Sequence, residues 1–337
     1  MRAACNRSPA AGQRALAQPA GQAAIVLLFQ EAAVPHGHDP LSVGSMTHDS
    51  PPAARDHGAH PVQQHGPDHD ADVQAEILDL DAEVLAEHIA FITAWLPVTA
   101  SPRHIVDLGC GTGAGTLALL NRFPESEVTA VDTSASHLHR LLEKSKAEGL
   151  VDRVHTVRAD LDAAWPDLGT PELVWASASM HHMADPDRTP RQVHDTLAPG
   201  GLFAVVELAD FPRFLPEDAP EGCPGLEERC HAALDQHHAE HVPHRGADWG
   251  PRLTAAGFTI EGERTIIVNI GPPHTEAVGR YALSSLRRIR GSVDQVLAPE
   301  DLTALDQLLD TDSPHSILRR ADLGVRTERT VWAARRT

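Results

Sequence analysis

Apolar residues recur at helical spacing through residues 72–96, beginning with Val73, Ile77 and Leu80. This period predicts one long amphipathic helix with a single face available for packing against a core. Residues 1–70, in contrast, are rich in Ala, Pro, Gly, His and Asp and show no apolar period. A segment of that composition buries too little apolar surface to offset the entropy lost on ordering. We therefore predict a disordered extension over 1–70 and a folded domain over 71–337.

Beyond residue 100, short apolar runs alternate with amphipathic segments. The predicted strands cover residues 104–108, 128–131, 154–157, 173–175 and 202–207. The predicted helices cover residues 116–123, 135–148 and 190–197. Strands that alternate with helices in this way form a parallel sheet with helices on both faces.

The alternation ends after residue 207. We predict two helical insertions, at about 208–246 and 271–327, after the fifth and sixth strands. The helical stretches expected there and between them cover residues 226–241, 249–256, 275–290, 298–310 and 314–321. Strands over 258–270 and 330–334 complete an α/β fold of seven strands, mostly parallel with the last one antiparallel.

The charge balance of the chain excludes some classes of binding partner. The 337 residues carry 28 Lys and Arg against 47 Asp and Glu, a formal net charge of −19. Nucleic-acid phosphates and anionic membrane surfaces attract basic faces, so we expect neither as a partner. The apolar run over 23–29 is far shorter than the about 20 residues that a membrane-spanning helix needs. The four cysteines lie too far apart in the chain for a disulfide scaffold, at Cys5, Cys110, Cys223 and Cys230.

A glycine-rich loop is the first chemical signal. Residues 105–115 read Ile-Val-Asp-Leu-Gly-Cys-Gly-Thr-Gly-Ala-Gly and join a predicted strand to a predicted helix. Glycines allow a tight turn, and the helix start offers free N–H donors to a nucleotide or related cofactor. Gly109, Gly111 and Ala114 also fit the dinucleotide fingerprint G-x-G-x-x-A. The loop alone leaves the cofactor open, and a plain tight turn is the alternative.

Asp132 ends the second predicted strand. A carboxylate at that position can accept hydrogen bonds from ribose hydroxyls, which NAD and other adenosine cofactors share. The alternative is an N-cap for the helix from residue 135, helped by Thr133 and Ser134. The position of Asp132 after the glycine loop favours ribose binding.

The remaining motifs define a resemblance. Asp107 precedes Gly109 by two residues, and Asp160-Leu161 follows the third strand. Residues 173–182 read Leu-Val-Trp-Ala-Ser-Ala-Ser-Met-His-His, and residues 197–201 read Leu-Ala-Pro-Gly-Gly. In this order and spacing the chain resembles the class I S-adenosylmethionine-dependent methyltransferases, over about 72–270 and the final strand. The resemblance implies a Rossmann-like doubly wound sheet and S-adenosyl-L-methionine as cofactor. The His181-His182 loop, followed by Asp185-Pro186, is similar to the subgroup that methylates small molecules.

The resemblance also implies roles for matching residues. Asp107 and the loop glycines would surround the methionine part of the cofactor, with Asp107 facing its amino group. Asp132 would bind the ribose, Asp160 the adenine amino group, and Leu161 would lie against the adenine ring. Ser177 and Ala178 would line the methionine side. The full predicted cofactor set is Asp107, Gly109, Cys110, Gly111, Gly113, Asp132, Thr133, Asp160, Leu161 and Ser177. For Cys110 we expect a packing role in the turn rather than nucleophilic chemistry.

Methyl transfer is an in-line displacement, so positioning in a dry pocket can supply most of the catalysis. A base is needed only when the attacking atom must lose a proton. His181, His182 and Glu207 are the candidates, because they follow strands at the edge where ligands bind. The alternatives are a histidine pair that orders the turn and a Glu207 carboxylate that satisfies local N–H groups.

The insertions are expected to build the acceptor pocket, because variable segments at the working edge of a sheet commonly do so. Candidate lining residues, each with packing as its alternative, are Glu227, Arg229, His231, Trp249, Tyr281 and Arg287. Histidines in 1–70 and around Cys223, Cys230, His231, Asp235 and His238 could ligate a metal. We predict no metal site, because neither group has zinc-ligand spacing.

The sequence therefore predicts a cytoplasmic S-adenosylmethionine-dependent methyltransferase with a small-molecule acceptor. The main alternative is a non-catalytic, methyltransferase-like protein that binds cofactor or a partner. An NAD-dependent oxidoreductase is disfavoured by the 197–201 turn and by Asp107. The 72–96 helix and the second insertion are surfaces that could pair two subunits, so a homodimer stays open.

Overall fold

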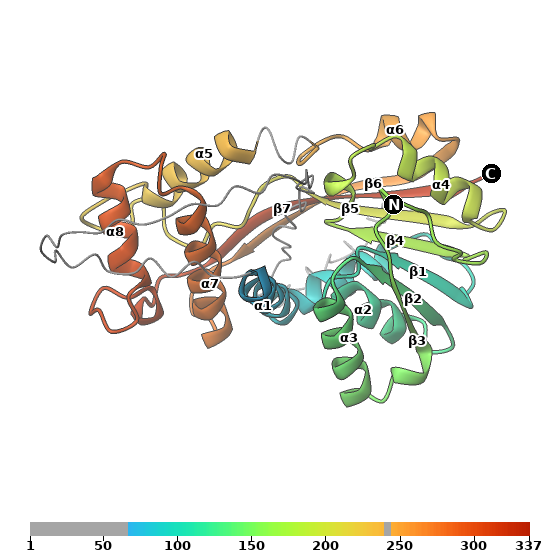
Figure 1. Cartoon of the computed structure of the whole chain (residues 1–337), viewed down its shortest axis with the longest axis horizontal. Helices are drawn as coiled ribbons and strands as arrows, with labels where there is room; N and C mark the ends of the chain where they lie inside the picture. The colour runs from blue at the N-terminus through green and yellow to red at the C-terminus, as the bar shows by residue number, and fades with distance from the viewer. Residues whose placement is uncertain (1–66, 239–243) are drawn as a thin grey trace, which may run out of the picture.

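The computed structural model describes residues 67–238 and 244–337 (Figure 1). The predicted disorder of residues 1–70 thus falls almost wholly outside the described residues. Helix α1 (Pro67–Trp95) begins before residue 70, where we predicted the extension to end. No helix in the described ranges combines the length and apolar character needed to cross a bilayer.

Seven strands form a single sheet in the order β3-β2-β1-β4-β5-β7-β6. The bounds are β1 (His104–Leu108), β2 (Glu127–Asp132), β3 (Val154–Arg158), β4 (Leu173–Ser177), β5 (Leu202–Leu208), β6 (Phe258–Ile270) and β7 (Val325–Arg336). The first five strands pair in parallel, and β7 is antiparallel to both of its neighbours. The predicted fold class is confirmed, including the antiparallel last strand.

The central strands are buried on both faces, because helices cover each side (Figure 1). Alternate residues of β1 enter different clusters: Ile105 packs with α1 and α2, whereas Val106 packs on the opposite face. One face holds α1, α2 (Ala114–Arg122) and α3 (Ala135–Ala147). The other holds α4 (Arg188–Thr196) and α6 (Gly250–Ala255). Two-sided burial explains why these strands read as continuous apolar runs.

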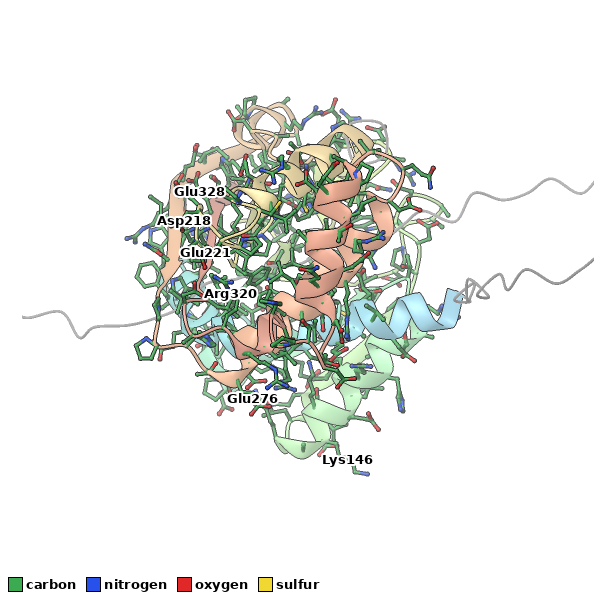
Figure 2. The ribbon with its side chains drawn as sticks, turned by 90° about the vertical axis from the view of Figure 1, so that its left-hand side faces the viewer. Lys146, Asp218, Glu221, Glu276, Arg320 and Glu328 are labelled. Atoms are coloured by element: carbon green, nitrogen blue, oxygen red, sulfur yellow. The ribbon has the colours of Figure 1, made fainter. Side chains whose placement is uncertain are left out.

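The insertions form a helical lobe beside the sheet, at the left of Figure 1, with charged side chains such as Glu276 and Glu221 on its outside (Figure 2). Its helices are α5 (Leu226–His238), α7 (Glu276–Ser292) and α8 (Pro299–Leu309). Two predictions are wrong in extent. Residues 314–321 hold only the short 3₁₀ helix η3 (Ile317–Arg319), and β7 begins at Val325, inside the predicted second insertion. The remaining 3₁₀ turns are η1 (Val151–Arg153) and η2 (Met180–His182).

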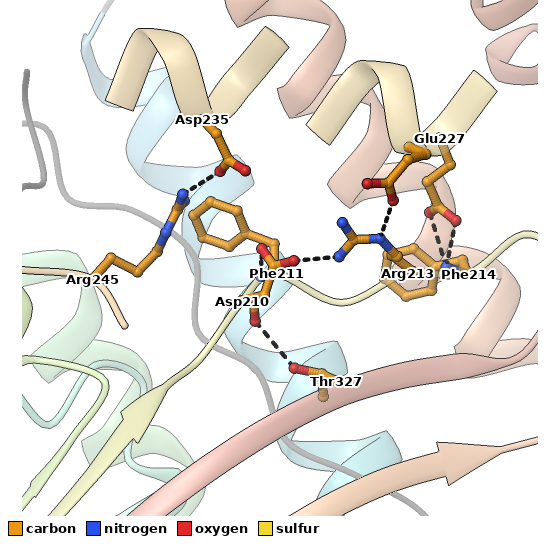
Figure 3. Close-up of polar contacts among 9 residues, drawn as sticks. Asp210, Phe211, Arg213, Phe214, Glu227, Asp235, Arg245 and Thr327 are labelled. Carbon is orange, nitrogen blue, oxygen red and sulfur yellow. Dashed lines mark hydrogen bonds and ion pairs between the residues drawn. The ribbon is translucent and has the colours of Figure 1, made fainter. Parts of the chain in front are cut away.

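Glu227 of α5 fastens the loop that follows β5 (Figure 3). Its buried carboxylate accepts hydrogen bonds from the backbone N–H of Phe214, at 2.8 Å, and of Leu215, at 2.8 Å. Burial raises the pKa of Glu227 to about 7, although these hydrogen bonds oppose the shift. Glu227 is therefore occupied by the loop after β5 and holds its chain in place.

Replacing Glu227 by Ala should lower the free energy of unfolding by about 2 to 4 kcal/mol, because two buried N–H groups lose their acceptor. Glu228→Ala is the matched control. Glu228 is adjacent but exposed, and its pairing with Arg213 should contribute less than about 1 kcal/mol. Urea unfolding of the full chain measures both values, and equal losses would contradict the anchoring role.

Candidate active site

The glycine loop folds back onto the end of β2. The backbone N–H groups of Gly109 and Cys110 both donate to the carbonyl of Val131, at 2.8 and 2.9 Å. Gly109 has a φ of 67°, and a Cβ there would lie 2.5 Å from the Cβ of Ser179. Gly113, with a φ of 96°, is the N-cap of α2. The loop therefore needs glycine for both its backbone conformation and its close contacts.

Asp107 lies buried beneath this loop. It accepts a hydrogen bond of 2.6 Å from the Thr116 hydroxyl of α2. Burial raises the pKa of Asp107 to about 7; the Thr116 bond opposes this shift and the nearby Asp132 adds to it. The indole Nε1 of Trp175 is buried without a hydrogen-bond partner among the described residues. A Cβ on Gly115 would lie 2.5 Å from that Nε1 and 3.2 Å from Asp107 Oδ2. The Asp107 carboxyl and the unpaired indole N–H of Trp175 therefore both lie beside Gly115.

Asp132 links the loop to α3. Its Oδ2 accepts from Gly111 N at 2.9 Å, and its Oδ1 accepts from Ser134 N at 2.8 Å. The N-cap of α3 is Ser134, whose hydroxyl accepts from His137 N. The capping function that we gave to Asp132 as the alternative therefore belongs to Ser134.

The predicted adenine residues differ in exposure. Asp160 is exposed after β3 and accepts from Asp162 N at 2.9 Å, whereas Leu161 is buried. Thr133 is exposed, and its carbonyl accepts from Arg158 Nε. These three positions lie at the ends of β2 and β3, on the same edge as the glycine loop.

A narrow cavity of about 20 Å³ separates the glycine loop from α1. The loop side includes Asp107, Gly109, Cys110, Trp175 and Ser177, and the α1 side contributes Leu78, Asp81 and Ile89. A volume of that size holds about one water molecule. α1 therefore packs closely against the glycine loop. Burial raises the pKa of the Cys110 thiol well above its usual range, which makes it a poor nucleophile.

His181 and Glu207 form a buried pair at the ends of β4 and β5. His181 Nδ1 lies 2.6 Å from Glu207 Oε2, and Glu207 Oε1 accepts from the backbone N–H of Met180 at 2.8 Å. Glu207 therefore satisfies local N–H groups and also fixes the imidazole. When Nδ1 donates to Glu207, Nε2 carries the free lone pair. His182 is half-buried, with its ring 4.1 Å from that of His181.

Most candidate pocket residues in the insertions have structural partners. Arg229 pairs with Asp301, Arg287 donates to the Leu309 carbonyl, and Trp249 is buried on the opposite face of the sheet. Tyr281 also has a partner: its hydroxyl donates at 2.9 Å to Asp81, which lines the loop cavity. A separate cavity of about 680 Å³ lies within the insertions, between residues 220–223, α8 and η3.

Two of the residues considered for a metal have other surroundings in the part of the chain that the structure describes. Asp235 pairs with Arg245, as Figure 3 shows, and His231 is buried with both ring nitrogens unpaired within the described chain. Burial, together with Arg213, lowers the pKa of His231 to about 4. Across 67–238 and 244–337, no three His, Cys, Asp or Glu side chains come together as metal ligands. The histidines of residues 1–66 lie outside the described residues.

Sequence reasoning missed three buried residues: Asp81 and Trp175, which line the loop cavity, and Arg329 on β7. Asp81 and Arg329 are almost fully buried, although both stand among polar residues in the sequence. Trp175 was noted only as part of a strand. An acidic residue on the apolar stripe of the 72–96 helix, next to Leu80, was the one available signal for Asp81.

Comparison with known proteins agrees with this geometry. Residues 105–201 match the family model of the methyltransferase domain. A trans-aconitate 2-methyltransferase from Acidovorax sp. (strain JS42) is 39% identical over 105 residues, covering 31% of this chain and 38% of the relative. A malonyl-[acyl-carrier protein] O-methyltransferase from Halorhodospira halophila is 32% identical over 203 residues, covering 57% of this chain and 62% of the relative. The crystal structure of a geranyl diphosphate C-methyltransferase from Streptomyces coelicolor A3(2) aligns with 16% identity, 82% and 85% coverage and a TM-score of 0.44.

The matched segment holds the glycine loop, Asp132, Asp160 and His181, and it ends before Glu207 and the insertions. It defines a methyltransferase domain on a Rossmann-like sheet. That segment is similar to the class I S-adenosylmethionine-dependent methyltransferases. The chain spans less than two thirds of the length of the curated relatives it matches.

The loop geometry predicts a steric difference between two glycines. Gly149→Ala meets no atom within 4 Å, so it should cost only the left-handed backbone strain of about 1 to 2 kcal/mol. Gly113→Ala adds a Cβ 2.3 Å from Leu141 Cδ1 and should cost at least about 1 kcal/mol more. Urea unfolding of both variants gives the difference, and equal values would show that the loop can relax freely.

Proposed function

We propose that this protein transfers a methyl group from S-adenosyl-L-methionine to a small-molecule acceptor. The observation that carries the proposal is the buried Asp107 beside the unpaired Trp175 indole, under a loop that only glycine can form. The two relatives are methyltransferases, which supports the reaction class. The cytoplasm is the compartment we expect.

The residues present suit this cofactor. Asp107 would hold its ammonium group in a charge-assisted hydrogen bond, with Gly109, Gly111 and Gly113 providing close backbone approach. Asp132 would accept from the ribose hydroxyls. Asp160 and Leu161 would meet the adenine, and Ser177 the methionine side. α1 would close over the site and exclude water.

When bound, the cofactor supplies an electrophilic methyl group on a sulfonium. The chain then has to orient the acceptor and, for a protonated nucleophile, remove its proton. We assign the removal of this proton to Nε2 of His181. Glu207 is the positioning residue that fixes the imidazole ring through Nδ1. Base and orienting carboxylate recur together in activated nucleophile systems. His182 is the neighbour against which His181 packs.

Calorimetric titration of the full chain with S-adenosylmethionine, S-adenosylhomocysteine and NAD tests the proposal. We expect saturable binding of the first two and none of NAD. Binding of NAD alone would overturn the proposal. Cofactor binding without turnover on a broad acceptor panel would favour the non-catalytic alternative.

The pKa of Asp107 predicts a pH dependence. The free carboxyl titrates at about 7, and a bound ammonium group favours its ionised form, so binding should release a proton. Affinity should therefore rise by about tenfold from about pH 6 to about pH 8, relative to Asp107→Asn. The ratio to the Asn variant removes any titration of the cofactor itself. A ratio that does not change with pH would exclude Asp107 as the ammonium partner.

The His181–Glu207 pair predicts a separate kinetic effect. Glu207→Gln should lower kcat by about 100-fold with an acceptor that must lose a proton, and should leave the cofactor Kd unchanged. Glu127→Gln is the matched control, because Glu127 forms an exposed pair with His155 at 3.1 Å. Steady-state rates across pH measure both variants, and an unaltered pH profile for Glu207→Gln would leave the pair with a structural role only.

A further inference from the structure

Arg329 is a buried cation without a direct partner. Its side chain on β7 is 1% exposed. None of Nε, Nη1 and Nη2 has a hydrogen-bond partner within the described chain. A guanidinium offers five N–H donors and is rarely buried unless these are paired. Such a group calls for a ligand or for an explanation.

The register of the sheet places Arg329 at the catalytic edge. It pairs with Leu208, the residue after Glu207, on β5 and with Ile266 on β6. Val331, two residues further along β7, packs in the cluster that includes α1 and α7, so Arg329 faces the same side. The strand therefore brings a guanidinium beside the end of β5, where the His181–Glu207 pair lies.

Arg329 also interacts electrostatically with a residue of the loop cavity. Burial lowers the pKa of Arg329 to about 10, and the charges of Asp81, Tyr281 and Glu207 oppose that shift. The group is thus cationic at neutral pH. Asp81 lines the cavity and accepts from Tyr281. Arg329 is therefore within electrostatic range of both the cavity wall and the His181–Glu207 pair.

A purely structural counterion would donate directly to one of these carboxylates. Leaving the N–H donors of a buried charged group unpaired costs free energy. A bidentate acceptor that reaches these donors removes that cost, so its binding is favoured. A carboxylate matches the planar fork of a guanidinium, whereas a neutral carbonyl can accept only in part. The unpaired Trp175 indole on the same face adds a further donor.

We propose that Arg329 binds a carboxylate of the methyl acceptor, so that the substrate is a small carboxylic acid. This inference rests on the proposed methyltransferase function. The carboxylate is the group recognised, whichever atom receives the methyl group. The methionine carboxylate of the cofactor has the same chemistry, and the experiment separates the two sources.

The probes are four acids, each with a neutral counterpart. They are malonate with malonamide, succinate with succinamide, benzoate with benzamide, and trans-aconitate with its trimethyl ester. Each is titrated calorimetrically into the full chain, with and without saturating S-adenosylhomocysteine. We expect at least one acid to bind at least about tenfold more tightly than its neutral counterpart.

Three variants locate the effect. Arg329→Met should remove the preference for acids, a loss of at least about tenfold, and should leave the Kd of S-adenosylhomocysteine within about threefold. Arg329→Lys keeps the charge without the fork and should retain part of the preference. Arg335→Met is the matched control: the same substitution on the same strand removes a pair with Glu261 and should change neither affinity.

The results that would contradict the carboxylate site differ from the results that would contradict the proposed function. No preference for any acid in the unmodified chain overturns the inference, and that comparison does not depend on any variant folding. An equal loss of S-adenosylhomocysteine affinity in Arg329→Met and Arg329→Lys assigns the guanidinium to the cofactor and also overturns it. Preferential binding of acids by a chain that binds neither S-adenosylmethionine nor S-adenosylhomocysteine supports the carboxylate site and defeats the proposed function instead.

Discussion

The contact between α1 and the glycine loop is the constraint on which the rest of the site depends. Leu78 lies against Gly111, and a Cβ there would come within 3.1 Å of it. The same helix places Asp81 against Tyr281 of α7, so it joins the sheet to the inserted lobe. A cofactor that binds under α1 would therefore be affected by the positions of both the sheet and the inserted lobe.

Buried ionisable side chains are the second feature of the sheet edge that carries the glycine loop. Asp107, Glu207 and Arg329 each lose almost all contact with water, and each is compensated differently. Asp107 accepts from a hydroxyl, Glu207 accepts from backbone N–H groups and pairs with an imidazole, and Arg329 has no hydrogen-bond partner among the described residues. Uncompensated buried charge is expensive, so it is retained mainly where a ligand completes it.

The inserted lobe and the sheet differ in their similarity to known proteins. The matched segment, residues 105–201, is the part that is similar to methyltransferase relatives. In the insertions, Tyr281 of α7 donates to Asp81 of α1, and Glu227 of α5 accepts from the loop that follows β5. Variation in such segments changes the acceptor without changing the sheet.

The sequence by itself determined the sheet and the glycine loop, because both arise from local patterns. The period of apolar residues predicted β1 and β6 to the residue, and the glycines defined the turn before α2. It could not place Asp81 and Trp175 at one cavity, because they are more than 90 residues apart in the chain and only the packing of α1 against the sheet brings them together. The pairing of His181 with Glu207 was likewise decided by the parallel register of β4 and β5, which sets their ends side by side. Tertiary structure decided which polar residues are buried, since burial depends on the elements packed above each residue and not on its neighbours in sequence.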